Sequence, residues 1–146
     1  MPIDTAIIGK TYPATTYAVG REKVREFALA VGESDPLYLD VDAARAAGFD
    51  DVVAPPMFAV VYGMQAVAQP MFDREVGIDF RRLVHGGQEF EWGPLVVAGD
   101  EISTTASISD VSGRGENSYY IFESVSTNAR GETVCTGRWT NIVRGG

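Results

Sequence analysis

Hydrophobic and polar residues are spaced differently in the two halves of this chain. In the first half, apolar residues recur at helical spacing over residues 20–32, and Gly32 marks the C-terminal stop. A second, short helix is predicted over residues 40–48. The β-branched and aromatic stretch 14–19 predicts a first strand. The first half is therefore predicted to be helical and irregular, with one strand.

The second half has the composition of β-strands. Its segments are rich in β-branched and aromatic residues and are separated by turn sequences that contain glycine. Four long strands are predicted, over residues 82–92, 100–111, 117–129 and 132–143. The last two connections are short enough for hairpins, which predicts antiparallel pairing.

The segment between the halves is apolar on nearly all sides. Pro55 and Pro56 fit the first turn of a helix that continues to about Gln69. Such a helix is either a membrane span or a core element. Three prolines, a glycine and two glutamines interrupt the run 52–72, whose uninterrupted helical part is shorter than the roughly 20 residues of a span. The strands are therefore predicted to curl around one buried helix, which gives an α+β domain.

Composition narrows the partners that this domain can have. The 146 residues are 45% hydrophobic and carry a formal net charge of −8, which argues against nucleic acid or an anionic membrane as the main partner. One cysteine, Cys135, excludes an internal disulfide, and with His85 as the one histidine no metal site is predicted. The first residues lack a basic segment followed by an apolar one, so we expect no signal peptide and a cytoplasmic location.

The stretch VGESDPLYLD, residues 31–40, is the candidate functional loop. Two acids, Glu33 and Asp35, follow the glycine helix stop, and Pro36 and the aromatic hydroxyl of Tyr38 come after them. An aspartate before a proline is typical of a cap or turn. The residues by themselves leave open whether this is an active-site loop, an altered one or only a turn.

The loop resembles the signature G-D-x-N-P-L-H-x-D of the MaoC-like branch of the hot-dog fold, matched without gaps over residues 32–40. The similarity continues with AARAAGFDDVVAPPMF at 43–58 and LVHGGQEFEWGPLVVAGDEI at 83–102. The (R)-specific enoyl-CoA hydratases and the (3R)-hydroxyacyl-ACP dehydratases belong to this branch. Within it, the chain most resembles the small-subunit type of the mycobacterial-type (3R)-hydroxyacyl-ACP dehydratases, the FAS1-like dehydratase domain.

The resemblance implies a fold, a reaction and partners. The fold is a single hot-dog domain over residues 1–146, with an antiparallel sheet wrapped around a long central helix. The reaction is the reversible removal of water from a 3-hydroxyacyl thioester of fatty-acid metabolism, carried by CoA or by an acyl carrier protein, and it needs no cofactor. Hot-dog domains typically work as dimers, so we expect a homodimer or a heterodimer.

In this family an aspartate and a histidine move the protons, while backbone N–H groups at the start of the central helix polarise the thioester carbonyl. The matching residues here, Glu33 and Tyr38, are the candidate catalytic residues. Glu33 keeps the carboxylate but moves it by roughly 1 Å, a displacement that can cost about 10²-fold in rate. A tyrosine pKa of about 10 leaves only about one side chain in a thousand ionised at pH 7. In the small-subunit type this pair is also degenerate, and a separate chain carries the intact pair.

Further residues are candidates for the substrate-binding wall. His85 and Gln88 are predicted to face the acyl-thioester channel or a partner subunit, and Gly86 allows a close approach of backbone or ligand. The competing interpretation is that His85 is only a polar residue at the start of a strand. On the central helix, most apolar side chains are expected in the core and a few in a tunnel for the acyl chain. The full set is Asp35, Pro56, Met57, Tyr62, His85, Gly86 and Gln88.

Three functions stay open at this point. The first is a dehydratase subunit, weak or inactive alone, that shapes the acyl channel and pairs with a chain carrying the intact Asp/His motif. The second is a protein that binds acyl thioesters or lipids without turnover, in a regulatory role. The third is a homodimeric hydratase that uses Glu33 and Tyr38 or recruits His85.

Overall fold

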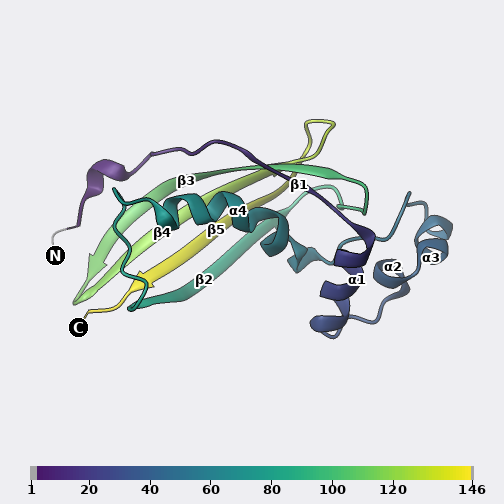
Figure 1. Ribbon diagram of the computed structural model, residues 1–146, viewed down its shortest axis with the longest axis horizontal. Helices are drawn as coiled ribbons and strands as arrows, with labels where there is room; N and C mark the ends of the chain where they lie inside the picture. Colours follow the sequence, from purple (N-terminus) through teal and green to yellow (C-terminus); the bar gives the residue numbers. More distant parts are fainter. Residues whose placement is uncertain (1–2, 146) are drawn as a thin grey trace.

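The computed structural model describes residues 3–145, which form one five-stranded sheet with helices (Figure 1). All strand pairs are antiparallel, and the strand order is β1-β3-β4-β5-β2. The strands are β1 (Thr15–Ala18), β2 (Leu83–Trp92), β3 (Glu101–Arg114), β4 (Asn117–Thr127) and β5 (Thr133–Val143). The helices are η1 (Thr5–Ile7), α1 (Arg21–Ala30), α2 (Pro36–Leu39), α3 (Val41–Ala46), η2 (Pro56–Phe58) and α4 (Ala59–Phe72).

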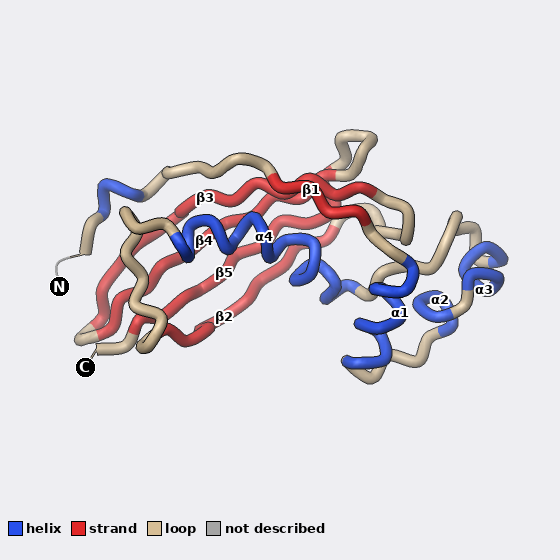
Figure 2. The backbone as a smooth tube through the Cα atoms, viewed as in Figure 1, coloured by secondary structure: helices blue, strands red, loops and turns tan. Residues whose placement is uncertain are grey.

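Helix α4 lies across one face of the sheet, and α1, α2 and α3 lie beyond one end of it (Figures 1 and 2). The prediction of an α+β hot-dog domain with a sheet around a central helix is confirmed. The four predicted long strands are present, with ends within three residues of their predicted positions. The short helix α2 was not predicted, and α4 runs past Gln69 to Phe72 with Pro70 inside it.

The sheet of this chain covers one side of the central helix and leaves the other side partly exposed. The side of α4 that faces the sheet is buried and carries small residues such as Gly63 and Ala66. On the other side, Met64 is 47% exposed and Phe72 is 72% exposed. One sheet can cover only one side of a helix, so the remaining apolar side stays partly exposed. No helix within residues 3–145 is both long and apolar enough to cross a membrane.

Trp139 of β5 fills the space between the sheet and α4. Its Nε1 donates to Oγ of Ser124 at 2.9 Å, and its ring meets Phe90 edge to face at 5.6 Å. Gly63 of α4 and Gly137 of β5 both lie against this indole. A Cβ at Gly63 would lie 3.4 Å from Trp139, an ordinary contact, whereas a Cβ at Gly137 would lie 2.7 Å from Nε1 and 2.5 Å from Oγ of Ser124.

A polar clamp joins the N-terminal segment to the end of α4. Lys10 Nζ lies 2.6 Å from Oδ2 of Asp73, and the Tyr12 hydroxyl donates to the same oxygen at 2.7 Å. Lys10 also pairs with Glu75. Hydrogen bonds from Lys10 and then Tyr12 lower the pKa of Asp73 to about 2, because both favour the ionised carboxylate.

We predict that the two glycines beside Trp139 respond in opposite ways to alanine. Gly137→Ala should lower the free energy of unfolding by about 1–3 kcal/mol, because the added methyl overpacks the indole and Ser124. Gly63→Ala, the matched control, should be neutral or stabilising by up to about 1 kcal/mol, because alanine favours a helix interior. Urea denaturation of both variants checks this. Equal losses for the two would contradict the close packing described for Gly137.

We predict that the clamp contributes to stability only while Asp73 is ionised. A carboxylate with a lowered pKa stabilises the fold above its unfolded pKa of about 3.9, and this contribution is lost as the pH falls towards 2. Asp73→Asn should therefore lower the urea midpoint at pH 7, and the deficit should shrink between pH 4 and the acid limit of folding. Asp50→Asn, at an exposed carboxylate without an ion pair in residues 3–145, is the control. A deficit that is constant with pH would rule out the ionic contribution.

Candidate functional site

The end of α1 sets the position of Glu33. Gly32 adopts a φ of +78°, and its N–H donates to the Leu29 carbonyl at 3.2 Å. The Glu33 N–H donates to the Ala28 carbonyl at 2.8 Å. These two bonds form a Schellman motif, which ends the helix and needs a residue that tolerates positive φ. The glycine before the acid is therefore required by the backbone, whatever the acid does.

Asp35 is used by the loop itself. It is the N-cap of α2, and its Oδ1 accepts the N–H of Leu37 at 2.9 Å. Asp40 caps α3 in the same way and accepts the N–H of Asp42 at 2.9 Å. The interpretation of Asp35 as a cap is thus the one that the geometry supports, and its role in binding substrate stays a prediction.

Tyr38 lies on α2 and is half-buried. Burial raises its pKa, and the negative charges of Glu33 and Asp35 raise it further. A higher pKa makes the phenol a weaker acid and leaves even less of the phenolate that could act as a base. The environment of Tyr38 therefore makes this side chain less suited to general acid–base catalysis at neutral pH.

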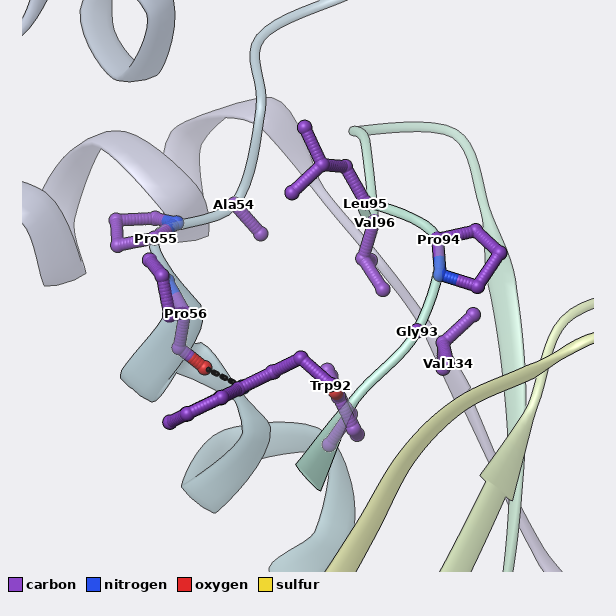
Figure 3. Close-up of a pocket in the computed structure, with 10 residues that line it drawn as sticks. Ala54, Pro55, Pro56, Trp92, Gly93, Pro94, Leu95, Val96 and Val134 are labelled. Atoms are coloured by element: carbon purple, nitrogen blue, oxygen red, sulfur yellow. Dashed lines mark hydrogen bonds between the residues drawn. The ribbon is translucent and has the colours of Figure 1, made fainter. Parts of the chain in front are cut away.

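Three cavities surround the start and the outer side of α4. The first, of about 540 Å³, has Glu33 at its wall together with Phe27, Val31 and the first residues of the central helix. The second, of about 190 Å³, lies between Pro56, Tyr62 and the turn after β2 (Figure 3). The third, of about 500 Å³, is called the α4 cavity here. It is lined by Met57, Val60, Met64, Val67 and Met71 of η2 and α4, and by Leu83, His85, Gln88, Trp139 and Asn141 of the sheet.

The turn into α4 has few backbone donors for a thioester carbonyl. Pro55 and Pro56 have no N–H, and the N–H of Phe58 donates to the Pro55 carbonyl at 2.8 Å. Within residues 3–145, Met57 has the one N–H of this turn that is not already hydrogen-bonded. Trp92 Nε1 donates to the Pro56 carbonyl at 2.9 Å (Figure 3), which fixes the peptide that contains this N–H. Because the peptide is trans, the Met57 N–H points away from Trp92.

A β-bulge places His85 and Gln88 on the same side of β2. In a regular strand, residues three apart face opposite sides of the sheet. Here the pairing with β5 shifts between His85 and Gly87, so His85 lies opposite Asn141 and Gln88 opposite Trp139. The extra residue is Gly86, where a Cβ would lie 2.4 Å from Cδ1 of Ile142. Both polar side chains thus reach the α4 cavity, while Gly86 packs on the other face.

The structure brings together most of the predicted wall residues. The α4 cavity is lined by Met57, His85 and Gln88 of the predicted set. The cavity of about 540 Å³ is lined by Glu33, Pro56 and Met57. The smallest cavity is lined by Pro56 and Tyr62. Gly86, Asp35 and Tyr38 lie outside these three walls.

Tyr62 sits deep in the wall of the smallest cavity. It is 4% exposed, and burial raises its pKa, with a smaller contribution from neighbouring Cys135. No group of three or more His, Cys, Asp or Glu side chains in residues 3–145 is arranged to hold a metal ion.

Several wall residues were not singled out from the sequence. Val60, Val67 and Met71 follow Met57 at steps of three, seven and four residues, so the helical period carried a signal for them. Trp92, Trp139 and Asn141 had no local signal, because only the sheet register places them beside α4.

The chain is similar to proteins of one family along nearly its whole length. A family model described as FAS1-like, dehydratase domain region, matches residues 6–137. A UPF0336 protein of Saccharopolyspora erythraea is 43% identical over 146 residues, covering 99% of this chain and 94% of that protein. A UPF0336 protein of Leifsonia xyli is 44% identical over 146 residues, which cover 99% of this chain and 98% of that protein.

Solved structures share the fold. The C-terminally truncated HadBC (3R-hydroxyacyl-ACP dehydratase) complex of Mycobacterium tuberculosis contains a chain that superposes with a TM-score of 0.80 and 31% identity, covering 93% of this chain and 96% of that one. A MaoC-like dehydratase gives a TM-score of 0.83 and 29% identity over 96% of this chain, which spans 43% of that longer protein. The R-hydratase PhaJ1 of Pseudomonas aeruginosa, at 17% identity and a TM-score of 0.71, shares the fold. The loop, the central helix and these matches together show that the chain belongs to the FAS1-like dehydratase domain family, within the MaoC-like hot-dog dehydratases and hydratases.

Proposed function

We propose that this chain is a subunit of a (3R)-hydroxyacyl-thioester dehydratase that shapes the acyl channel while a partner chain supplies the Asp/His pair. The observation that carries the proposal is the α4 cavity, an apolar space of about 500 Å³. It shares Met57 and Val60 with the cavity that has Glu33 at its wall, next to a motif loop whose proton-handling groups are altered. The similarity to a chain of the HadBC complex supports a role in a two-chain enzyme.

The altered groups argue against catalysis by this chain alone. Dehydration needs one group that removes the α-proton and another that protonates the leaving hydroxide. The raised pKa of Tyr38 makes it a poor substitute for histidine. The two prolines before α4 also leave the Met57 N–H as the one backbone donor at that turn for a developing oxyanion, and loss of such a donor typically costs about 10²–10³-fold in rate.

The α4 cavity has the chemistry and the length for an acyl chain. Its walls are mainly methionine, valine and leucine side chains, and methionine adapts to ligands of variable shape. Met57 and Met71 are the first and last helical residues of its wall, and at 1.5 Å per helical residue they are roughly 21 Å apart. An extended fatty chain can lie along α4 over that distance.

A partner chain would also cover surfaces that this chain leaves open. Strand β2 is at the edge of the sheet, so one row of its backbone groups is available for pairing. The exposed side of α4, with Met64 and Phe72, adds apolar area beside it. A second hot-dog chain of the same or a different sequence fits both requirements, and a dimer follows.

We predict that hydration activity appears only with a partner. The purified chain should hydrate trans-2-enoyl-CoA slowly or not at all, and co-expression with an intact-motif MaoC-like chain should restore turnover, followed at the thioester enone absorbance. Glu33→Gln in this chain should change the rate of the complex by less than about threefold, since the partner moves the protons. If this chain instead worked as a homodimeric hydratase, Glu33→Gln would cost about 10²–10⁴-fold. Binding of acyl thioesters without turnover, even beside that partner, would favour a regulatory binder.

We also predict that Met64 limits the acyl chain. Met64→Trp should raise KM for long-chain enoyl thioesters by about tenfold and leave KM for the four-carbon substrate unchanged, because the larger ring fills part of the α4 cavity. A tenfold change corresponds to about 1.4 kcal/mol of binding free energy. Gln65→Trp, at the next position of α4 and outside the cavity wall, is the matched control and should not change KM for long-chain substrates relative to short ones. Equal KM changes for long and short substrates would place the acyl chain elsewhere.

A further inference from the structure

We infer that residues 34–50, called the α2–α3 lobe here, open as a unit while the sheet and α4 stay folded, and that this motion gates entry to the cavity beside Glu33. The lobe contains α2 and α3 and projects beyond the end of the sheet (Figures 1 and 2). The gating role rests on the proposed function, because it takes this cavity as the entrance to the acyl channel. The opening itself does not depend on that function.

The α2–α3 lobe is poorly buried. Of its 17 residues only Ala44 is fully buried, and the larger apolar side chains of α2 are half-buried. The chain on either side of the lobe is different, because Val24 and Ala28 of α1 are buried and so are all four residues of 52–55. Segments with few buried apolar side chains open at a much lower free energy than the core does. Local opening is therefore expected in the lobe and not in the segments that flank it.

Few contacts hold the lobe against the rest of the chain. Within residues 3–145, one hydrogen bond joins the two, from the Val53 N–H to the Leu37 carbonyl at 2.8 Å. The other hydrogen bonds of the lobe are internal, and none of its charged side chains forms an ion pair with another described segment. Val41 packs against the core beside the buried Ala44. The closed position thus depends on one hydrogen bond and a small apolar contact.

The segments on both sides of the lobe are fixed to the core. Before the lobe, the Glu33 N–H is hydrogen-bonded to α1, and after it the Ala54 N–H donates to the Val96 carbonyl at 2.8 Å. Between these fixed points and the lobe helices, residues 33–35 and 49–51 belong to no helix or strand. Hinges are typically a few loop residues that absorb the change in φ and ψ. These two short segments can therefore act as the hinges of the lobe.

The two ends of the lobe meet at the wall of one cavity. Glu33 comes directly before the lobe and Pro55 follows soon after it, and both line the cavity of about 540 Å³. The lobe therefore leaves this wall and returns to it, and its opening widens that side of the entrance. Tyr38 moves with the lobe, whereas Glu33 stays at the end of α1. Opening thus also separates the two altered positions of the motif.

Two neighbouring amides distinguish opening of the lobe from global unfolding. Val53 is 2% exposed, and its N–H loses its acceptor when Leu37 moves away, whereas the Ala54 N–H is held by Val96. Hydrogen exchange of the full-length chain, followed by NMR, should show a protection factor at Val53 about 100-fold or more below that at Ala54. Protection factors within about threefold of each other would overturn the inference, because the lobe would then open only when the whole domain unfolds.

Ala44→Leu should open the lobe further, because the fully buried site has no room for a larger side chain. Protection at Val53 should fall by a further factor of about ten, and protection at Ala54 should change by less than about threefold. Ala46→Leu, the same change at an exposed position of α3, is the matched control and should affect neither amide. Ala44→Gly, which removes the buried methyl group and weakens the helix, secures the test if Ala44→Leu does not fold. Equal losses at both amides in the Ala44 variants would contradict an independent lobe.

Binding kinetics of decanoyl-CoA, which the proposed reaction does not convert, test the gating role. Stopped-flow mixing follows the fluorescence of Trp139 in the α4 cavity wall. Ala44→Leu should raise the association rate constant by about threefold or more, and Ala46→Leu should leave it unchanged. An unchanged rate in Ala44→Leu, despite the loss of protection at Val53, would overturn the gating role and leave the acyl channel standing. No binding by the wild-type chain would reject the channel and the gate together, while exchange at Val53 would still decide whether the lobe opens.

Discussion

The covering of helix α4 is the constraint on which the rest of this structure depends. The helix is apolar on nearly all sides, and one sheet can bury only the side with Gly63 and Ala66, where small residues let the backbone approach Trp139. Met57, Val60, Met64 and Met71 remain partly open on the other side, and together with the buried Val67 they form the helical wall of the α4 cavity. The same geometry that makes the core incomplete therefore leaves the α4 cavity and an exposed apolar surface, which we propose as the acyl channel and the surface for a partner.

The motif loop shows how shape and chemistry can separate. Its path is fixed by backbone requirements: positive φ at Gly32, the bond from Glu33 N–H to the Ala28 carbonyl, and the Asp35 cap of α2. None of these requirements depends on the acid–base pair. The positions of Glu33 and Tyr38 can therefore change their chemistry while the loop keeps its place beside α4, which is the state that we propose for this chain.

Local patterns predicted the strands, the helix stop at Gly32 and the Asp35 cap, because each follows from a few neighbouring residues. Helical spacing also predicted part of the cavity wall. Met57, Met64 and Met71 follow one another at intervals of seven residues, which places them on the same side of a helix. The placement of Trp139 could not be predicted, because it depends on the register between β2 and β5. The bulge could not be predicted either. Gly86 predicted a close approach of backbone or ligand, whereas it lies against Ile142, and the register shift beside it brings His85 and Gln88 to one side.

The start of α4 favours the division of labour between two chains that we propose. Pro56 is the first residue of η2, where its fixed φ suits a helical turn, and Pro55 is the N-cap before it. The two prolines remove two N–H groups from the place where an oxyanion would be held. Trp92 then holds the turn against β2 through the Pro56 carbonyl. A helix start that is rigid and poor in donors serves the wall of a channel better than a catalytic centre. In the two-chain enzyme that we propose, donors on the other chain would hold the thioester oxygen, and the edge strand β2 offers backbone groups for pairing with that chain.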